Sequence, residues 1–443
     1  MLKLPPLRFT LKGIVSALLV AAVLVPAVDL PRAAQAQNQQ STLPAVARKQ
    51  AEFVPGELLV RFRPGQTVAN TKGTTQLSML SGGRSLRVEI NSFGGSNLVE
   101  GLKLARVSPE RTLDAIKALR VRPDVLYAEP NYIRHLDAVP NDSFYGSQWP
   151  LKNSPSEIGG GISAESAWDT TTGNQNIVVG VIDSGIDIDH RDLNDNIFTN
   201  TAETPNNNVD DDNNGFVDDL NGWDFINHDR TVFDNANDDF HGTHVAGIIG
   251  ARGNNWAGIA GVNWNVQLLP LKAIGPGGGT DAVLLEAYSY VKTMRQRGVN
   301  LRVLNNSYGG QAFSQSLFDA IKELGNAGIL FVAAAGNDTL NNDSVPHFPA
   351  TCDLPNVISV AASNQGGFFA SEFSNRGSQT VHLAAPGDTV LSTTPHGYTG
   401  TGLVAANTDP DGSTYSNLSG TSMAAPHVTG AAALAVAANP GIS

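Results

Sequence analysis

Three reactive side chains stand far apart in the chain, each within a short run of Gly, Ser, Thr and small apolar residues. Asp183 ends the run V-V-G-V-I-D, His241 opens H-G-T-H-V-A-G, and Ser422 stands in G-T-S-M-A-A-P. A serine hydroxyl is a weak nucleophile, and it attacks a carbonyl efficiently only when a histidine takes its proton and an acid orients that histidine. These residue types therefore suit nucleophilic hydrolysis, with the members in the chain order Asp, His, Ser.

Taken singly, each of these residues also has a structural interpretation. Asp183 could cap a strand-to-helix turn, and Ser422 could be an ordinary N-cap serine. His244 follows His241 by three residues, so the two could bind a metal ion together, but no further His or Cys stands close to them in the sequence. Because zinc sites draw on three or four such ligands, we predict that His244 is a buried, hydrogen-bonded core histidine.

A fourth candidate follows another apolar run. Residues 331–335 read F-V-A-A-A, and Gly336 and Asn337 come next. An amide here could donate to the oxyanion of a tetrahedral intermediate, together with the backbone N–H of Ser422 at an expected helix N-terminus. The alternative for Asn337 is a turn residue. All four candidates fall at the ends of expected strands or helices, where α/β sheets place reactive groups, and this favours the catalytic interpretation.

The elements that must position these residues alternate along the chain. Continuous β-branched and apolar runs predict strands buried on both faces, and stretches with helical spacing lie between them. Such alternation predicts a parallel sheet with right-handed crossovers. The fold class is therefore α/β, with a mostly parallel central sheet flanked by helices. The expected strands are 177–182, 266–271, 299–304, 329–334 and 357–361, and the expected helices are 241–251, 281–297 and 315–327.

Residues 53–137 predict a separate, small α+β unit ahead of this sheet. Short runs of alternating apolar residues indicate strands, and one stretch between them has helical spacing. The expected elements are strands at 57–62, 102–107 and 125–127 and a helix at 109–119, with Ser108 as its N-cap and Leu113, Ile116 and Leu119 on one face.

Residues 1–36 predict an export signal. A cationic start precedes the apolar stretch 13–28, and the segment closes on the small-residue sequence A-Q-A. An uncleaved membrane anchor is the alternative, but Pro26 interrupts the stretch, which is short for a span of about 20 residues. We expect a secreted protein with no membrane association after signal cleavage. Residues 37–52, rich in Gln, Asn and Ala, predict a linker.

The composition is that of a globular, acidic chain. Apolar residues make up 41% of the 443 residues, and the net charge is −12 with a pI near 5.1. A negative chain is a poor partner for polyanions, so we expect no nucleic-acid partner. Cys352 is the only cysteine and cannot form an internal disulfide. We expect it to be an ordinary core or loop residue, and bound metal is then a candidate source of stability for an exported protein.

An acidic segment predicts where such a metal would bind. Between residues 206 and 240 there are ten Asp, and Arg230 is the only Lys or Arg. Oxygen ligands at alternate positions before the Gly of a sharp turn are typical of calcium loops. The position of the final EF-hand glutamate holds Asn221, so we expect no EF-hand helices, and a solvated acidic loop is the alternative. The candidate calcium ligands are Asp210, Asp212, Asn214 and Asp218.

The segments around Asp183, His241, Ser422 and Asn337 together resemble the subtilisin-like serine proteases (subtilases), over about residues 140–443. The resemblance implies that the aspartate orients the histidine, the histidine is general base and acid, the serine is the nucleophile and the asparagine donates to the oxyanion. It also implies two walls of a substrate cleft, one that pairs with an extended peptide and one that forms a roomy apolar pocket for the residue before the cut. The first wall is Ser307, Tyr308 and Gly309, and the second is Ala333, Ala335 and Gly336.

The same resemblance implies a second calcium site and a zymogen. The second site would use Asp142, Asp192 and the loop that contains Asn254. Residues 53–137 are similar to the inhibitor-type propeptide of subtilases, which implies an intramolecular inhibitor removed by self-cleavage near its end. Residues 138–443 would then be a C-terminally incomplete peptidase domain. The alternative for the smaller unit is a permanent substrate-binding domain.

The predicted function is that of a secreted serine endopeptidase that acts on protein or peptide substrates through an acyl-enzyme. Two other function classes remain open at this point. One is a non-catalytic calcium-binding surface or adhesion protein, and the other is an esterase or lipase. The run G-T-S-M-A around Ser422 departs at its last position from the G-x-S-x-G of α/β-hydrolases, which disfavours the latter.

Overall fold

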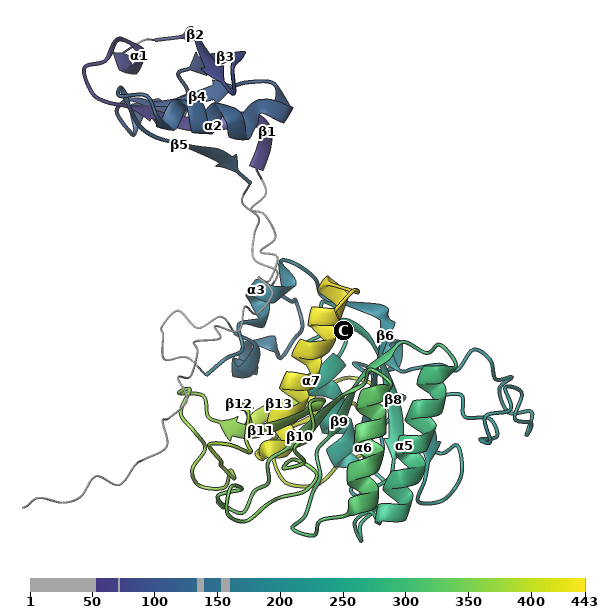
Figure 1. Ribbon diagram of the computed structural model, residues 1–443. Helices are drawn as coiled ribbons and strands as arrows, with labels where there is room; N and C mark the ends of the chain where they lie inside the picture. Colours follow the sequence, from purple (N-terminus) through teal and green to yellow (C-terminus); the bar gives the residue numbers. More distant parts are fainter. Residues whose placement is uncertain (1–52, 71, 134–138, 153–159, 443) are drawn as a thin grey trace, which may run out of the picture. The chain divides into compact units, whose positions relative to one another are not determined.

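The protein forms two compact units that divide between Arg134 and His135. This computed structural model describes residues 53–70, 72–133, 139–152 and 160–442 (Figure 1). The predicted export signal and linker, 1–36 and 37–52, lie outside the described residues, as does the region of the predicted boundary, 134–138.

The smaller unit is a five-stranded antiparallel sheet in the order β2-β3-β4-β1-β5, with helix α2 packed on it. Strand β1 alternates buried and partly exposed residues, and its Leu58, Val60 and Phe62 are fully buried. They pack with Ile116 and Leu119 of α2, so the unit has its own core. The elements are β1 (Phe53–Phe62), α1 (Thr67–Asn70), β2 (Thr74–Ser81), β3 (Arg84–Asn91), β4 (Leu102–Arg106), α2 (Thr112–Arg120) and β5 (Val125–Tyr132), with 3₁₀ turns at Gly94–Asn97 and Pro109–Arg111.

Helix α2 begins three residues later than the sequence suggested. Ser108 precedes the 3₁₀ turn and makes no side-chain cap bond, so the N-cap prediction is wrong. Thr112 Oγ1 donates to the Pro109 carbonyl and accepts from the Gly56 N–H, which holds the first residue of α2 against the sheet. Leu113, predicted to share a face with Ile116 and Leu119, is 46% exposed, whereas those two residues are buried.

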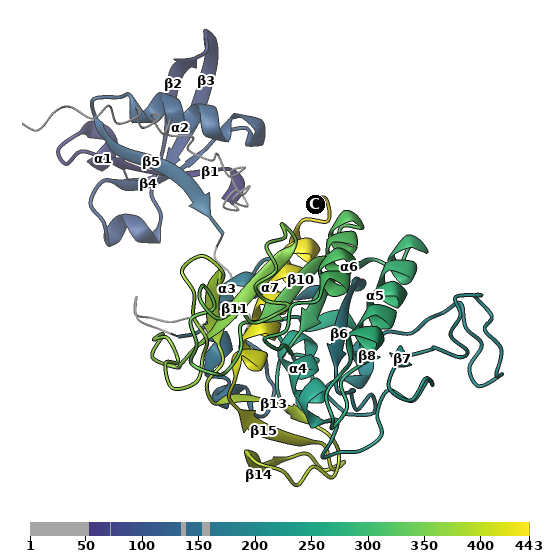
Figure 2. The same ribbon diagram turned by 60° about the horizontal axis from the view of Figure 1, so that its bottom comes forward.

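The larger unit is built on a seven-stranded parallel sheet in the order β12-β11-β10-β9-β6-β8-β7 (Figure 2). Each recorded pairing in it is parallel, which confirms the predicted α/β class. Crossover connections bring the carboxyl ends of its strands to one edge. The strands are β6 (Gly173–Asp183), β7 (Trp223–Asp224), β8 (Asn265–Lys272), β9 (Leu301–Asn306), β10 (Leu330–Ala334), β11 (Val357–Ser363) and β12 (Leu383–Pro386).

Helices cover both faces of this sheet (Figures 1 and 2). One apolar core joins the sheet to α5 and α6, and a second core joins the opposite face to α4 and α7. Among the described residues, no helix is both long enough and apolar enough to cross a membrane. The helices are α3 (Ala164–Trp168), α4 (Phe240–Gly250), α5 (Asp281–Gln296), α6 (Gln315–Asn326) and α7 (Thr421–Ala438), with 3₁₀ turns at Tyr145–Ser147, Trp149–Leu151 and Asn194–Asn196.

A three-stranded antiparallel sheet, absent from the sequence-based expectations, supports helix α4. Its order is β13-β15-β14, with β13 (Val390–Thr394), β14 (Leu403–Thr408) and β15 (Thr414–Leu418). Ser392 Oγ and Thr393 Oγ1 in β13 donate to the carbonyls of His244 and Thr243, each at 2.7 Å. These bonds anchor the first turns of α4, the helix that carries His241.

Candidate active site

Asp183 and His241 form a hydrogen-bonded pair at the carboxyl edge of the large sheet. Asp183 is the last residue of β6, and His241 is the second residue of α4. His241 Nδ1 lies 2.7 Å from Asp183 Oδ1. Because a carboxylate only accepts, Nδ1 carries the proton, and Nε2 of the neutral ring keeps its lone pair. Gly242 permits this approach, since a Cβ there would lie 2.2 Å from the Gly185 carbonyl oxygen.

The surroundings of the pair favour a charged His241. The Asp183 side chain is 4% exposed and also accepts from the Ser184 N–H at 2.7 Å, whereas the His241 side chain is 30% exposed to solvent. Burial disfavours the imidazolium, but the charge and hydrogen bond of Asp183 outweigh it, so the pKa of His241 is raised above its usual value. A histidine of this kind can take a proton and hold it.

His244 is a core residue, as predicted. It is fully buried, and its Nε2 lies 3.0 Å from the Ser416 carbonyl oxygen. Burial lowers the pKa of His244 to about 3. Its Nε2 is thereby bonded to β15, and its Nδ1 is buried without a hydrogen-bond partner among the described residues.

Ser422 is the second residue of α7, in a first turn whose N–H groups lack helical partners. Its Oγ donates to the Ser307 carbonyl at 3.2 Å, and Ser307 Oγ donates in return to the Ser422 carbonyl at 3.0 Å. The second bond replaces one that the helix cannot make, because Pro426, four residues on, has no N–H. Among the described residues, the Ser422 hydroxyl bonds the Ser307 carbonyl and makes no hydrogen bond to His241.

Asn337 lies directly beside the start of α7, past the end of β10. Its Oδ1 accepts from the Thr421 N–H at 2.8 Å and from Thr421 Oγ1 at 2.9 Å. These two bonds fix the orientation of the amide and leave Nδ2 as a donor next to the first turn of α7. A Cβ on Gly420 would lie 3.4 Å from that Nδ2, which shows how close the amide is to this turn.

The predicted substrate segment continues from β9 along the same edge. Gly310 exchanges two backbone hydrogen bonds with Phe348, at 2.7 and 2.8 Å, and this bridge holds one side of the segment. Tyr308 turns its ring inward, and its hydroxyl lies 2.6 Å from Tyr288 Oη and donates to Asn306 Oδ1 at 3.1 Å. The segment is therefore held in an extended form by contacts on its buried side.

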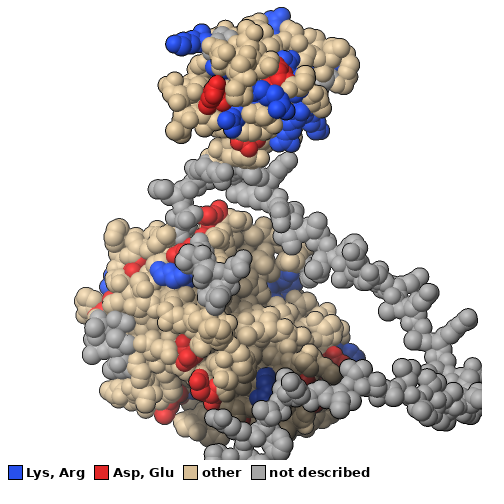
Figure 3. All heavy atoms as spheres, turned by 90° about the vertical axis from the view of Figure 1, so that its left-hand side faces the viewer, with Lys and Arg blue, Asp and Glu red and all other residues tan. Residues whose placement is uncertain are grey.

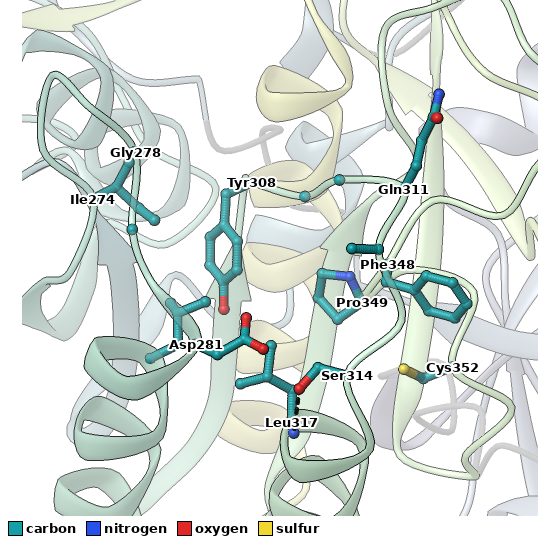
Figure 4. Close-up of a pocket in the computed structure, with 15 residues that line it drawn as sticks. Ile274, Gly278, Asp281, Tyr308, Gln311, Ser314, Leu317, Phe348, Pro349 and Cys352 are labelled. Carbon is teal, nitrogen blue, oxygen red and sulfur yellow. Dashed lines mark hydrogen bonds between the residues drawn. The ribbon is translucent and has the colours of Figure 1, made fainter.

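Tyr308 lines a cavity of about 470 Å³ between the starts of α5 and α6 (Figure 4). Asp281 opens α5 and Leu317 lies in the first turn of α6, and both point into this space with Tyr308. Cys352 also lines the cavity and is 6% exposed, and burial raises its pKa to about 11, which makes it an inert thiol.

The second predicted wall differs from the expectation of a roomy apolar pocket. Ala333 and Ala335 are fully buried. The space between Gly309 and Gly336 holds the imidazole of His347, which the sequence analysis missed. A Cβ on Gly309 would lie 2.3 Å from His347 Nε2, and one on Gly336 would lie 2.9 Å from its Nδ1. The two predicted walls are thus brought together, but a polar ring stands between them.

The predicted calcium ligands of the acidic segment make hydrogen bonds of their own. Asp210 accepts from the N–H groups of Asn214 and Gly215, and Asp218 accepts from two backbone N–H groups and from Arg230. These two carboxylates are therefore satisfied within the loop. Asn214 turns its Nδ2, not its oxygen, toward Asp212 at 3.3 Å.

Asp212 instead gathers with two carboxylates that the sequence analysis missed, Glu203 and Asp219. One oxygen from each of the three residues lies within 4.8 Å of the other two. Burial is the main cause that raises the pKa of both Glu203 and Asp219, with their acidic neighbours adding to it. Arg297 offsets part of this charge, with its Nη1 3.2 Å from Asp212 Oδ1. An oxygen-rich, negative group of this kind fits a hard divalent cation.

The predicted second calcium site also brings its two carboxylates together. Asp142 is 5% exposed and Asp192 fully buried, and burial raises their pKa values to about 7 and about 6. Asn254 contributes its backbone N–H, which donates to Asp142 Oδ2 at 2.7 Å. Asp142 Oδ1 is buried without a hydrogen-bond partner among the described residues. An orphaned carboxylate oxygen beside a second buried acid fits a cation site.

Comparison with known proteins finds a matching family model for each of the two units. The subtilase family, Peptidase S8, matches residues 174–443, and the fervidolysin N-terminal prodomain matches residues 39–131. The chain is 36% identical over 329 residues to an extracellular basic protease of Dichelobacter nodosus, covering 71% of this chain and 51% of that protein. It is 32% identical over 403 residues to an extracellular protease of Xanthomonas campestris pv. campestris, covering 87% and 66%.

A solved structure extends the comparison to the fold. A protease from Pseudoalteromonas arctica superposes with a TM-score of 0.52 at 31% identity, covering 69% of this chain and 89% of that one. The chain spans about half to two thirds of the length of the curated relatives quoted above. Since the family match covers more than half of the chain, it confirms the resemblance that the motifs suggested. The chain therefore belongs to the subtilase family, and a unit of the fervidolysin prodomain type precedes its Peptidase S8 domain.

Proposed function

We propose that the protein is a secreted serine endopeptidase made as a zymogen. Ser422 attacks the peptide carbonyl, and His241 takes its proton on Nε2 and later gives it to the leaving amine. Asp183 holds the ring, and the Ser422 N–H and Asn337 Nδ2 stabilise the oxyanion until water releases the acyl-enzyme. The observation that carries the proposal is the 2.7 Å bond between His241 Nδ1 and Asp183 Oδ1, which keeps the proton on Nδ1 and the lone pair on Nε2.

The substrate is an extended protein or peptide chain. The exposed backbone of Gly309 follows β9 and can pair with such a chain, as when a peptide adds to a sheet edge. The relatives quoted above are named as extracellular proteases, which supports secretion and agrees with the predicted export signal. In this proposal residues 1–36 are removed on export and residues 37–52 form a linker. Residues 53–137 form the propeptide, and residues 138–443 form the peptidase domain.

The propeptide is proposed to inhibit its own peptidase before self-cleavage. Residues 53–133 hold eleven Lys and Arg against seven Asp and Glu, a net charge of +4. Residues 139–443 hold eleven Lys and Arg against thirty-one Asp and Glu, which gives a net charge of −20. On the face that Figure 3 shows, Lys and Arg predominate over Asp and Glu in the smaller unit. Opposite charge favours association of the two units after the chain is cut.

A fluorophosphonate probe tests the catalytic proposal, because only an activated serine is labelled. We expect labelling at Ser422, and N-terminal sequencing of the mature product should place the cut near Asp137. Absence of labelling would instead support a non-catalytic protein that has kept the fold. A labelled protein that cleaves simple esters but no peptide would support the esterase alternative.

The rate should fall as the pH drops, because only neutral His241 can accept the serine proton. The usual histidine pKa is about 6.5, and Asp183 raises that of His241. We therefore expect kcat/KM to be lost progressively below a midpoint that lies above 6.5. The measurement is a pH–rate profile on a neutral peptide. A rate that stays flat down to pH 4 would exclude His241 as the base.

Calcium should stabilise the larger unit through the buried carboxylates. We propose two sites, one at Asp142 and Asp192 and one at Glu203, Asp212 and Asp219. A ligand present at a hundred times its Kd adds about 2.7 kcal/mol to the free energy of unfolding. At roughly 2–4 °C per kcal/mol, chelation with EDTA should lower the Tm by about 5–10 °C.

Variants separate the two proposed calcium sites. Asp142→Asn should remove the part of the calcium-dependent rise in Tm that comes from the first site and keep the part from the second. Asp219→Asn should remove the part from the second site and keep the part from the first. Asp114→Asn, in the smaller unit, is the control and should keep the full response. A melting curve that is the same with EDTA and with added calcium would contradict structural calcium at either site.

A further inference from the structure

We propose that Asn305 and Thr429 are positioning residues for Ser422, and that they act through the hydroxyl of Ser307. This inference rests on the proposed function, in which Ser422 is the nucleophile. Three side chains form a hydrogen-bond network between α7 and the end of β9. Thr429 Oγ1 donates to Asn305 Oδ1 at 2.9 Å, and Asn305 Nδ2 donates to Ser307 Oγ at 2.9 Å. Ser307 Oγ in turn donates to the Ser422 carbonyl at 3.0 Å.

The direction of each bond in this network follows from the groups that take part. The Asn305 amide accepts only at Oδ1 and donates only at Nδ2. Because the Thr429 hydroxyl donates to Oδ1, it keeps Nδ2 turned toward Ser307. The Ser307 hydroxyl has one proton, and it accepts from Asn305 Nδ2, so its own proton goes to the Ser422 carbonyl. Loss of either bond to Asn305 therefore frees the Ser307 hydroxyl to turn away from Ser422.

The Ser422 carbonyl depends on this bond because Pro426 offers no N–H to it. The preceding residue is held from another strand, since Asn337 accepts from the Thr421 N–H and hydroxyl. The Ser422 side of the turn is held from β9. Ser422 supplies both the proposed nucleophile and the N–H of the proposed oxyanion site. A shift of this one residue would thus misplace two groups that act in the transition state.

The network lies in the core, where a broken hydrogen bond is costly. Asn305 and Thr429 are fully buried, and Ser307 is buried as well. Val303, two residues before Asn305 on the same face of β9, packs in an apolar cluster with Ala424 of α7. An amide on such a face must be satisfied by specific partners, and here the partners lead to Ser422. The alternative is that Asn305 and Thr429 only join α7 to the sheet.

The test uses the full chain and measures the reactivity of Ser422 directly. Asn305→Asp keeps the shape of the side chain and an acceptor for Thr429, but an ionised carboxylate cannot donate to Ser307. The Ser307 proton is then drawn to the carboxylate. We expect the rate constants for fluorophosphonate labelling and for self-processing to fall about 10–100-fold, because a misplacement of about 1 Å can cost about 10²-fold. Both are measured at alkaline pH, where His241 is neutral and the new carboxyl is ionised.

Thr429→Val is the second variant, because it removes the hydroxyl without adding a charge. It leaves the Asn305 amide without the donor that orients it. We expect kcat on a peptide to fall about tenfold or more with KM nearly unchanged. The midpoint of the pH–rate profile should stay at its wild-type position, because the pair of Asp183 and His241 is untouched. Thr429→Ser restores the hydroxyl and should restore most of kcat.

Asn263→Asp is the matched control. Asn263 is another buried asparagine whose Nδ2 donates to α7, at the Gly430 carbonyl and 2.9 Å, outside the network. This variant should lower the Tm and keep the labelling rate of the folded protein.

Two outcomes would overturn the inference in different ways. If wild-type Ser422 is labelled and the Asn305→Asp and Thr429→Val proteins are labelled at the same rate, the two residues only join α7 to the sheet, and the proposed function stands. Absence of labelling in wild type would overturn the proposed function and this inference together. The comparison of Thr429→Val with Thr429→Ser decides the question even if Asn305→Asp fails to fold.

Discussion

Replacing Ser422 with alanine is expected to abolish both peptide hydrolysis and self-processing. The variant lacks the atom that forms the acyl-enzyme, and loss of a triad nucleophile costs about 10⁶-fold in kcat. Residual turnover would come only from the oxyanion donors and from binding. The measurements are a peptide assay and the mass of the purified chain, which should remain uncut near residue 137.

Ser419→Ala is the control for the loss of a hydroxyl near the start of α7. The Ser419 hydroxyl bonds Asp388 and the Thr389 N–H, outside the catalytic group, so activity should persist. The decisive comparison is made on purified protein, because an unrelated protease could also cut the chain near residue 137. A purified Ser422→Ala chain that still trims itself near residue 137 would show that another group carries the chemistry.

Removing the amide donor of Asn337 should lower kcat by about 10²–10³ and leave KM nearly unchanged, since the donor acts on charge that develops in the transition state. Asn337→Asp is the sharper variant. It keeps an oxygen to accept from the Thr421 N–H and hydroxyl and replaces only the donating nitrogen. Steady-state kinetics on one peptide give both parameters.

Asn337→Ala serves as the comparison, because it also removes the acceptor of Thr421. We expect a similar loss in kcat with a lower Tm, whereas Asn337→Asp should melt close to wild type. A kcat within threefold of wild type for both variants would leave Asn337 as the turn residue of the alternative interpretation. A rise in KM alone would assign it to substrate binding.

The large sheet was predictable because its strands are continuous apolar runs. The predicted strand 177–182 lies within β6, and 357–361 lies within β11. The three-stranded sheet gave no such signal. Its buried residues include Thr394, Thr414 and Ser416, which are satisfied by hydrogen bonds among their own hydroxyls instead of by apolar contact. A search for hydrophobic periodicity does not detect a strand of this kind.

The missed hairpin of β2 and β3 did carry a local signal. Gly82 and Gly83 have φ values of +57° and +76°, and they join strands whose pairing ends at Ser81 and Arg84. Two adjacent glycines between alternating residues are typical of a two-residue hairpin turn. The surrounding Ser and Arg residues make the strand pattern weak, which is why only the turn could have revealed the element.

The candidate site was predictable where chemistry restricts the residue type, and less so where only folding brings residues together. Asp183 and His241 could be recognised as candidates because few residue types can act as the acid and the base of a hydrolytic triad. His347 stands ten positions after Asn337 and returns between two glycines through the bridge of Phe348 with Gly310. Glu203 is likewise brought next to Asp219 by folding, although it stands outside the predicted calcium loop. Neither of these two contacts can be predicted from the spacing of residues in the sequence.

The proline in the second turn of α7 has a consequence for the newly made chain. The carbonyl of Ser422 receives its hydrogen bond from Ser307, the residue after β9, which lies 115 positions earlier in the sequence. The turn that bears the proposed nucleophile is therefore held by this distant segment and not by its own helix. Such distant contacts form late in folding. If the proposed function holds, a chain that has not yet made this contact lacks a fixed Ser422 turn, and we expect it to show no serine reactivity.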